Sequence, residues 1–374
     1  MTDIKLCRSA ILCVCLICIS LAFIPIAQAQ DAAAGVEIGE INGAAFRIEV
    51  PQDWNGGLVM YAHGYATVGS PLPDYEQTDN PLRTAYLSRG FAIAESAYSK
   101  QGWAVKEALE DTEAVRRHFV QRYGQPNTTI ITGHSMGGVI TMGTIERYPE
   151  VYEGALPICG PLSPALDFME NHMFDMLVTF DYLFGTHHDD VPILADPTSE
   201  SLNLEAVQAA LDAKPETANR FALLFNAKPE HTARVLGFFQ VILKELVERT
   251  GGNPLDNRNT VYAGFEDDVA VNRGVQRYAA DPAAQEYLKQ YYSPTGRISD
   301  PVLALHTTYD QLVPADYLNY YDVVVTREGN QDRFAMQFVA ADGHCNISAE
   351  KTGAAFDDLL NWVTTGTRPT PGER

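Results

Sequence analysis

The amino-acid sequence predicts an α/β fold in which helices cover both faces of a mostly parallel sheet. Short apolar runs typical of buried strands alternate with helical patterns between residues 58 and 159, and this alternation resumes between residues 301 and 363. Strands that alternate with helices favour parallel pairing, because each helix carries the chain back across the sheet. The intervening residues 162–298 show mostly helical patterning.

The N-terminus differs in composition from the rest of the chain. Lys5 and Arg8 precede an uncharged apolar run over residues 9–26, which ends in Ala27-Gln28-Ala29. This order is typical of a secretory signal peptide, so residues 1–29 are predicted to be removed and the mature protein to be secreted or periplasmic. The alternative is a retained membrane anchor, since the run approaches the length of a membrane span.

Residues 30–161 are predicted to form the first part of the core. Alternating segments at 36–41 and 44–50 flank Asn42-Gly43, which is a strong hairpin signal. An amphipathic helix is expected over residues 105–123, because apolar residues recur there at spacings of three and four until Gly124. Buried strands are expected at residues 58–62, 91–97, 128–132 and 154–159.

Residues 162–298 are predicted to be a helical cap inserted into the core, because the strand pattern resumes after them. One helix carries an apolar face formed by Met169, Met173, Leu177, Phe180 and Phe184. This face, together with Phe238-Phe239, either forms the core of the cap or lines an acyl or aromatic pocket. Residues 299–374 complete the core with strands at 301–306 and 334–340 and a closing helix, and the tail from Thr367 is expected to be frayed.

The segment Gly133-His134-Ser135-Met136-Gly137 lies between a predicted strand and a predicted helix. It carries the G-x-S-x-G pattern, in which small residues flank the serine because the sharp turn crowds the backbone. The strained apex of such a turn exposes the hydroxyl above the sheet edge. Ser135 is therefore predicted to be a nucleophile, and the alternative is an ordinary strand-to-helix turn.

A serine hydroxyl becomes an effective nucleophile when a base accepts its proton and an acid orients that base. His344, in a loop after the last core strand, is the predicted base, and Asp310, after the preceding strand, is the predicted acid. Asp167 and Asp342 are the competing acids. Two other histidines close to predicted strand ends, His134 and His306, are expected to pack rather than react.

The tetrahedral intermediate of acyl transfer requires two backbone N–H donors directed at its oxygen. Met136 follows the nucleophile and is predicted to supply one of them. The second is expected from the loop after residues 58–62, where Gly64 allows close approach of the backbone and Tyr65 carries the N–H.

The elbow, His63-Gly64-Tyr65, the D-x-x-V-P segment that begins at Asp310, and Gly343-His344 together resemble the α/β-hydrolase superfamily. The resemblance extends from about Gly57 to the C-terminus, apart from the cap. It implies an eight-stranded, mostly parallel sheet with the active site at its C-terminal edge beneath the cap, but it does not specify the substrate.

Two cysteines, Cys159 and Cys345, remain after removal of the signal peptide. In an oxidising compartment they form one disulfide or stay as buried free thiols. The His344-Cys345 pair resembles the secreted tannase and feruloyl esterase group, in which cysteines adjoining the serine and the histidine are bridged, although His134 precedes Ser135 here. Because the histidine loop must reach back across two strands to meet the serine, Cys345 is expected above the end of the Cys159 strand, which favours a disulfide.

Charge and composition exclude several classes of partner and cofactor. The formal net charge of −21 produces an acidic surface that repels phosphate backbones, so nucleic acid is not an expected partner. After the N-terminal run no stretch is apolar enough to insert into a membrane. The cluster His187-His188-Asp189-Asp190 is not predicted to bind a metal, because adjacent residues point in different directions and no second cluster supports them. Neither a metal nor another cofactor is expected, and the oligomeric state is left open.

The expected function is that of a secreted serine hydrolase that cleaves small or polymer-derived carboxylic esters through an acyl-enzyme. One alternative is a serine peptidase of the same fold, in which an acidic side chain among residues 266–268 binds the amino group of a short peptide. The other is a non-catalytic binding protein that has kept the fold.

Overall fold

The computed structural model describes residues 34–374, except residues 78, 186–190 and 201. The predicted signal peptide and the His187–Asp190 cluster therefore lie outside the described residues. Within these limits, no helix is sufficiently long and apolar to cross a membrane.

In the described part of the chain, nine strands form one sheet in the order β1-β2-β4-β3-β5-β6-β7-β8-β9. Strand β2 is antiparallel to both of its neighbours, and the other neighbouring pairs are parallel, which confirms the predicted mostly parallel sheet. The strands are β1 (Gly35–Ile41), β2 (Ala44–Val50), β3 (Gly57–Ala62), β4 (Ala92–Ser96), β5 (Thr128–His134), β6 (Gly154–Ile158), β7 (Val302–Tyr309), β8 (Phe334–Asp342) and β9 (Gly372–Glu373).

The ninth strand lies in the tail that was expected to be frayed. The two residues of β9 pair in parallel with β8, which would otherwise be the edge strand of the sheet. The C-terminal Arg374 fixes this pairing, since its N–H donates to the carbonyl oxygen of Phe338 and its guanidinium pairs with Asp358 at 2.9 Å. The expectation of eight strands and a frayed tail is therefore wrong at this edge.

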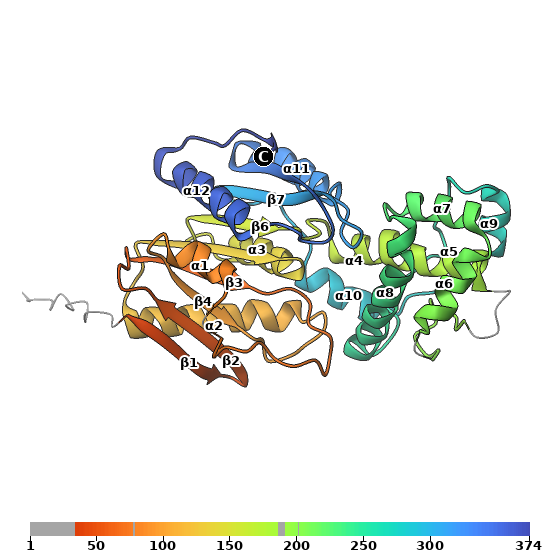
Figure 1. Cartoon of the computed structure of the whole chain (residues 1–374), viewed down its shortest axis with the longest axis horizontal. Helices are drawn as coiled ribbons and strands as arrows, with labels where there is room; N and C mark the ends of the chain where they lie inside the picture. The colour runs from red at the N-terminus through yellow and green to blue at the C-terminus, as the bar shows by residue number, and fades with distance from the viewer. Residues whose placement is uncertain (1–33, 78, 186–190, 201) are drawn as a thin grey trace, which may run out of the picture.

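Helices cover both faces of the sheet (Figure 1). On one face, α1 (Pro81–Leu87) and α12 (Ala349–Thr365) share a buried apolar cluster with the sheet. On the other face, α2 (Val105–Tyr123), α3 (Met136–Arg147) and α11 (Tyr317–Arg327) contribute to a second cluster. Successive strand residues point to opposite faces, and both faces are buried, which explains the continuous apolar runs in the sequence.

The elements described between β6 and β7 are helical and lie beside the sheet (Figure 1). The stripe of Met169, Met173, Leu177, Phe180 and Phe184 is fully buried, so it forms the core of this region rather than the wall of an open pocket. The helices are α4 (Ala165–Phe168), the π-helical turn η1 (Met169–Phe174), α5 (Asp175–Leu183), α6 (Leu204–Asp212), α7 (Pro215–Leu224), α8 (Pro229–Thr250), α9 (Asp268–Gly274) and α10 (Pro282–Tyr291).

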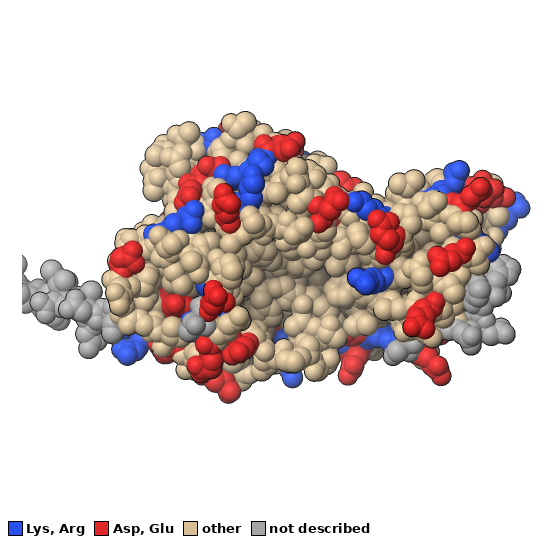
Figure 2. Space-filling model, in the orientation of Figure 1, with Lys and Arg blue, Asp and Glu red and all other residues tan. Residues whose placement is uncertain are grey.

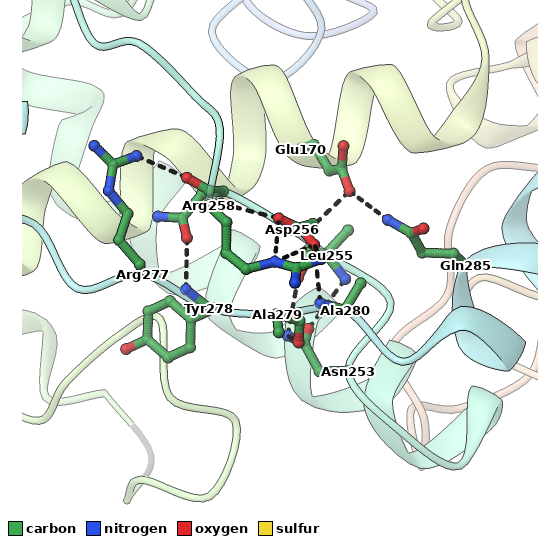
Figure 3. A network of polar contacts seen from close by, with 11 residues as sticks. Glu170, Asn253, Leu255, Asp256, Arg258, Arg277, Tyr278, Ala279, Ala280 and Gln285 are labelled. Atoms are coloured by element: carbon green, nitrogen blue, oxygen red, sulfur yellow. Dashed lines mark hydrogen bonds and ion pairs between the residues drawn. The ribbon is translucent and has the colours of Figure 1, made fainter.

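A polar network joins the non-helical segments near Asp256 to the helices of this region (Figure 3). Glu170 of η1 accepts hydrogen bonds from the N–H of Asp256 at 2.9 Å and from the amide of Gln285 on α10 at 3.0 Å. Asp256 also pairs with Arg258. Burial raises the pKa of Glu170, against the effect of these two hydrogen bonds. The network holds an irregular segment in place through hydrogen bonds, in addition to the apolar packing of Leu255.

Candidate active site

The residues of the elbow turn are held in a tightly packed backbone. Strand β5 ends at His134 and α3 begins at Met136, which leaves Ser135 between them with φ 58° and ψ −124°. A Cβ atom added to Gly133 or Gly137 would lie 2.4 or 2.0 Å from the carbonyl oxygen of Ala62 on β3. Glycine is required at both positions because the neighbouring strand leaves no room for a side chain, which is the physical basis of the pattern.

Ser135, His344 and Asp310 form one hydrogen-bonded chain at the C-terminal edge of the sheet. The Ser135 Oγ lies 2.8 Å from His344 Nε2, and His344 Nδ1 lies 2.7 Å from Asp310 Oδ2. The serine and the histidine are 209 residues apart in the sequence, and each of the three follows a different strand. The imidazole can therefore accept the serine proton on one nitrogen while its other nitrogen donates to the carboxylate.

Asp310 is held as a carboxylate by its surroundings. Its side chain is fully buried, and its Oδ1 accepts hydrogen bonds from the N–H groups of Leu312 and Val313, both at 2.9 Å. Burial alone would raise the pKa of Asp310, but the contact with His344 and the hydrogen bond from Val313 outweigh it, so the pKa is lowered. An ionised acid at this position stabilises the imidazolium that forms when the serine gives up its proton.

The two competing acids lie elsewhere. Asp342 is largely exposed and pairs with Lys228, the residue before α8, at 2.6 Å. Asp167 lies on α4 and lines a small surface cavity with Asp316 and Tyr320. Of the three carboxylates considered from the sequence, Asp310 is the one that the structure places against His344.

The predicted oxyanion donors flank the nucleophile. Met136 is the first residue of α3, so its N–H has no acceptor within the helix. On the other side, a Cβ added to Gly64 would lie 3.2 Å from the Cβ of Ser135, which places the loop that leads into Tyr65 directly against the serine. The Tyr65 ring packs edge-to-face against Phe238 of α8 with ring centroids 5.5 Å apart.

Cys159 and Cys345 form a disulfide with a Cα–Cα distance of 5.4 Å. Cys159 directly follows β6, the neighbour of the strand that leads into Ser135, and Cys345 directly follows His344. The bridge therefore ties the histidine loop to the sheet beside the serine, as the sequence predicts.

The two histidines expected to pack do pack in the structure. His134 lies against Tyr61, and burial together with the nearby His344 lowers the pKa of His134 to about 4. His306 is buried, its Nδ1 lies 3.0 Å from the carbonyl oxygen of Thr307, and burial lowers its pKa as well. Among the residues that the structure describes, no group of three or more His, Cys, Asp or Glu side chains is arranged to hold a metal ion.

Phe238-Phe239 of α8 were expected in the cap core or in a pocket wall, but the contacts of α8 with the loops at the edge of the sheet are not among the predicted features. His231, Phe238 and Glu245 recur every seven residues on this helix and contact Tyr309, Tyr65 and Trp103 in turn. A spacing of seven places side chains on the same face of a helix, which is the signal that the sequence offers for this contact line. Helix α8 lies where the helical region meets the sheet, and a hollow opens between the two parts (Figures 1 and 2).

The chain is similar to several known proteins. A family model described as "Tannase-like family of unknown function" matches residues 42–190. The o-phthalyl amidase of Xanthobacter agilis is 23% identical over 91% of this chain and 90% of its own length. The mostly parallel sheet, with the turn that carries Ser135 between β5 and α3, is a fold of the α/β-hydrolase type. The match to the family model agrees with the tannase-like resemblance inferred from the sequence, although His344-Cys345, on which that resemblance was based, lies outside the matched residues.

Two solved esterase structures are among those similar to this chain. Feruloyl esterase B from Aspergillus oryzae is 13% identical, covers 87% of this chain and 78% of its own, and superimposes with a TM-score of 0.49. Est1E from Butyrivibrio proteoclasticus is 12% identical, covers 89% of this chain and 100% of its own, and has a TM-score of 0.43.

Proposed function

We propose that the protein is a secreted serine hydrolase that cleaves carboxylic esters through a covalent acyl-enzyme. The observation that carries this proposal is the hydrogen-bonded chain from Ser135 through His344 to Asp310, with separations of 2.8 and 2.7 Å. The disulfide supports an oxidising compartment, in keeping with the signal peptide predicted from the sequence.

The geometry supports the following sequence of steps. Ser135 Oγ attacks the substrate carbonyl carbon while His344 Nε2 takes its proton, and the N–H groups of Met136 and Tyr65 stabilise the oxyanion. Collapse of this intermediate breaks the bond to the alcohol, which leaves with the proton from His344. Water then attacks the acyl-enzyme, His344 accepts a proton from it, and the carboxylic acid is released as Ser135 is regenerated. Asp310 stays ionised throughout and orients the imidazole.

Amide hydrolysis by the same residues is the second candidate. It is favoured by the relative named o-phthalyl amidase, which aligns over most of both chains. The peptidase alternative, in which an acidic side chain among residues 266–268 binds the amino group of a peptide, has less support. Asp267 caps α9 and Asp268 accepts the N–H of Phe265, and Figure 1 shows α9 at the end of the helical region remote from the sheet.

The test uses a fluorophosphonate probe and matched pairs of p-nitrophenyl esters and p-nitroanilides that share an acyl group. Labelling of Ser135 in the wild type, with loss of both labelling and hydrolysis in Ser135→Ala, is the expected result. Ester turnover well above anilide turnover identifies an esterase, and the reverse identifies an amidase. Full hydrolytic activity in Ser135→Ala would contradict the mechanism, and a wild type that neither reacts with the probe nor turns over any substrate would favour a binding protein.

A further inference from the structure

Helix α8 reaches the loops at the C-terminal edge of the sheet at more than one point. Near its start, the N–H of Lys228 and Nδ1 of His231 lie 2.8 and 3.1 Å from the hydroxyl of Tyr309, the residue before Asp310. Near its end, Glu245 and Arg249 reach the loop that follows β4. The helix thus touches both the loop of the candidate acid and a loop on the oxyanion side.

Glu245 and Arg249 form a largely buried ion pair at the second of these points. Their side chains are 9% and 11% exposed, and Arg249 Nε lies 2.5 Å from Glu245 Oε1. The second carboxylate oxygen of Glu245 accepts the N–H of Trp103 at 2.9 Å, and Arg249 donates to the carbonyl oxygen of Gln101. Both charges are therefore used to hold the backbone of residues 101–103, in addition to holding each other.

Gly102 lies between these two contacts and fits against the ion pair. It has φ +85°, and a Cβ added to it would lie 2.3 Å from Glu245 Oε1. Its N–H donates to the carbonyl oxygen of Ala66 at 2.8 Å, and the two residues form an isolated antiparallel bridge. Ala66 directly follows Tyr65, so the segment held by α8 is bonded to the residue next to the candidate oxyanion donor.

We infer that Glu245 and Arg249 are positioning residues that hold the N–H of Tyr65 in line for the oxyanion, acting through Gly102 and Ala66. This inference rests on the proposed function and adds a role for the helical region in transition-state stabilisation. Burying an ion pair is poor evidence for stability, because desolvation offsets much of the attraction. The contacts with the loop account for the ion pair. The carboxylate of Glu245 accepts from the N–H of Trp103, and the guanidinium of Arg249 donates to the carbonyl oxygen of Gln101.

The test measures kcat and KM of Glu245→Gln on an oxoester and on the matching thionoester. Loss of one oxyanion donor lowers kcat by about 10²–10³-fold in serine hydrolases, so a misplaced donor is expected to lower it by roughly 10-fold or more. Thionoester hydrolysis is expected to fall less, because a thiocarbonyl sulfur accepts hydrogen bonds weakly and depends less on the N–H donors. KM is expected to stay near the wild-type value.

The matched control is Glu113→Gln. Glu113 belongs to another buried ion pair, with Arg116 on α2, and this pair also holds a polar partner, the hydroxyl of Tyr152. Glu113→Gln is expected to change oxoester and thionoester turnover equally, if at all. Arg249→Lys, which keeps the charge but loses the planar set of donors, replaces Glu245→Gln if that variant does not fold, and the same result is expected.

Equal losses on the two substrates, or an unchanged kcat, would overturn the positioning role while leaving the proposed function intact, provided that the wild type is labelled at Ser135. A wild type that is not labelled would overturn the proposed function, and this inference with it.

Discussion

Replacing both Cys159 and Cys345 with serine is expected to destabilise the folded protein by an amount set by the length of chain between them. The two cysteines are 186 residues apart. Closing a loop of that length in the unfolded chain removes conformational entropy equivalent to about 5 kcal/mol at 25 °C, and loss of native disulfides typically costs about 2–5 kcal/mol. Because Cys345 adjoins His344, the loss also frees the loop of the candidate base, so kcat is expected to fall along with stability.

The assay is guanidinium chloride unfolding of the wild type and the double variant, with and without dithiothreitol. The wild type without reductant is expected to unfold at a higher midpoint than the other three samples, because reductant removes the same cross-link that the substitutions remove. Dithiothreitol should not shift the double variant, which makes that variant the control for other effects of the reductant. Two free thiols in the unreduced, denatured wild type, or a double variant with the wild-type midpoint, would refute the reasoning.

Substitution of Asp310 and of Asp175 tests the roles of these two carboxylates. Asp310→Asn is expected to lower kcat by a factor on the order of 10⁴ with little change in KM, because the imidazole loses the acceptor that fixes its tautomer. The matched variant Asp342→Asn should retain activity, and similar losses in both would argue against Asp310 as the acid. Burial raises the pKa of Asp175 to about 6, above its ordinary value of 3.8. The stability that its protonation contributes is therefore present at low pH and is lost as the pH rises through about 6. Asp175→Asn should flatten the pH dependence of the urea unfolding midpoint between pH 3.8 and about 6. An unchanged pH dependence in this variant would show that Asp175 does not contribute to it.

Local patterns in the sequence determined the type and order of most elements. Alternating strand and helix patterns predicted a parallel sheet, because strands that are buried on both faces have continuous apolar sequences. The glycines around Ser135 predicted the elbow, because the backbone of Ala62 leaves no room for a side chain at these positions. The order of Ser135, Asp310 and His344 predicted which side chains would meet. These features are encoded within a few residues of each site.

Features that depend on contacts between distant segments were decided by the tertiary structure. The short helices α1 and α11 and the strand β9 are not among the predicted elements, since short segments gain their stability from packing against the rest of the fold. The sequence favoured Asp310 over Asp167 and Asp342, and the paths of the loops place Asp310 against His344. The role of α8 needed the contact between Glu245 and a loop 142 residues earlier. Sequence patterns record how each residue is buried and how its backbone turns. They do not record which distant partner completes a hydrogen bond, because that depends on how the whole chain closes on itself.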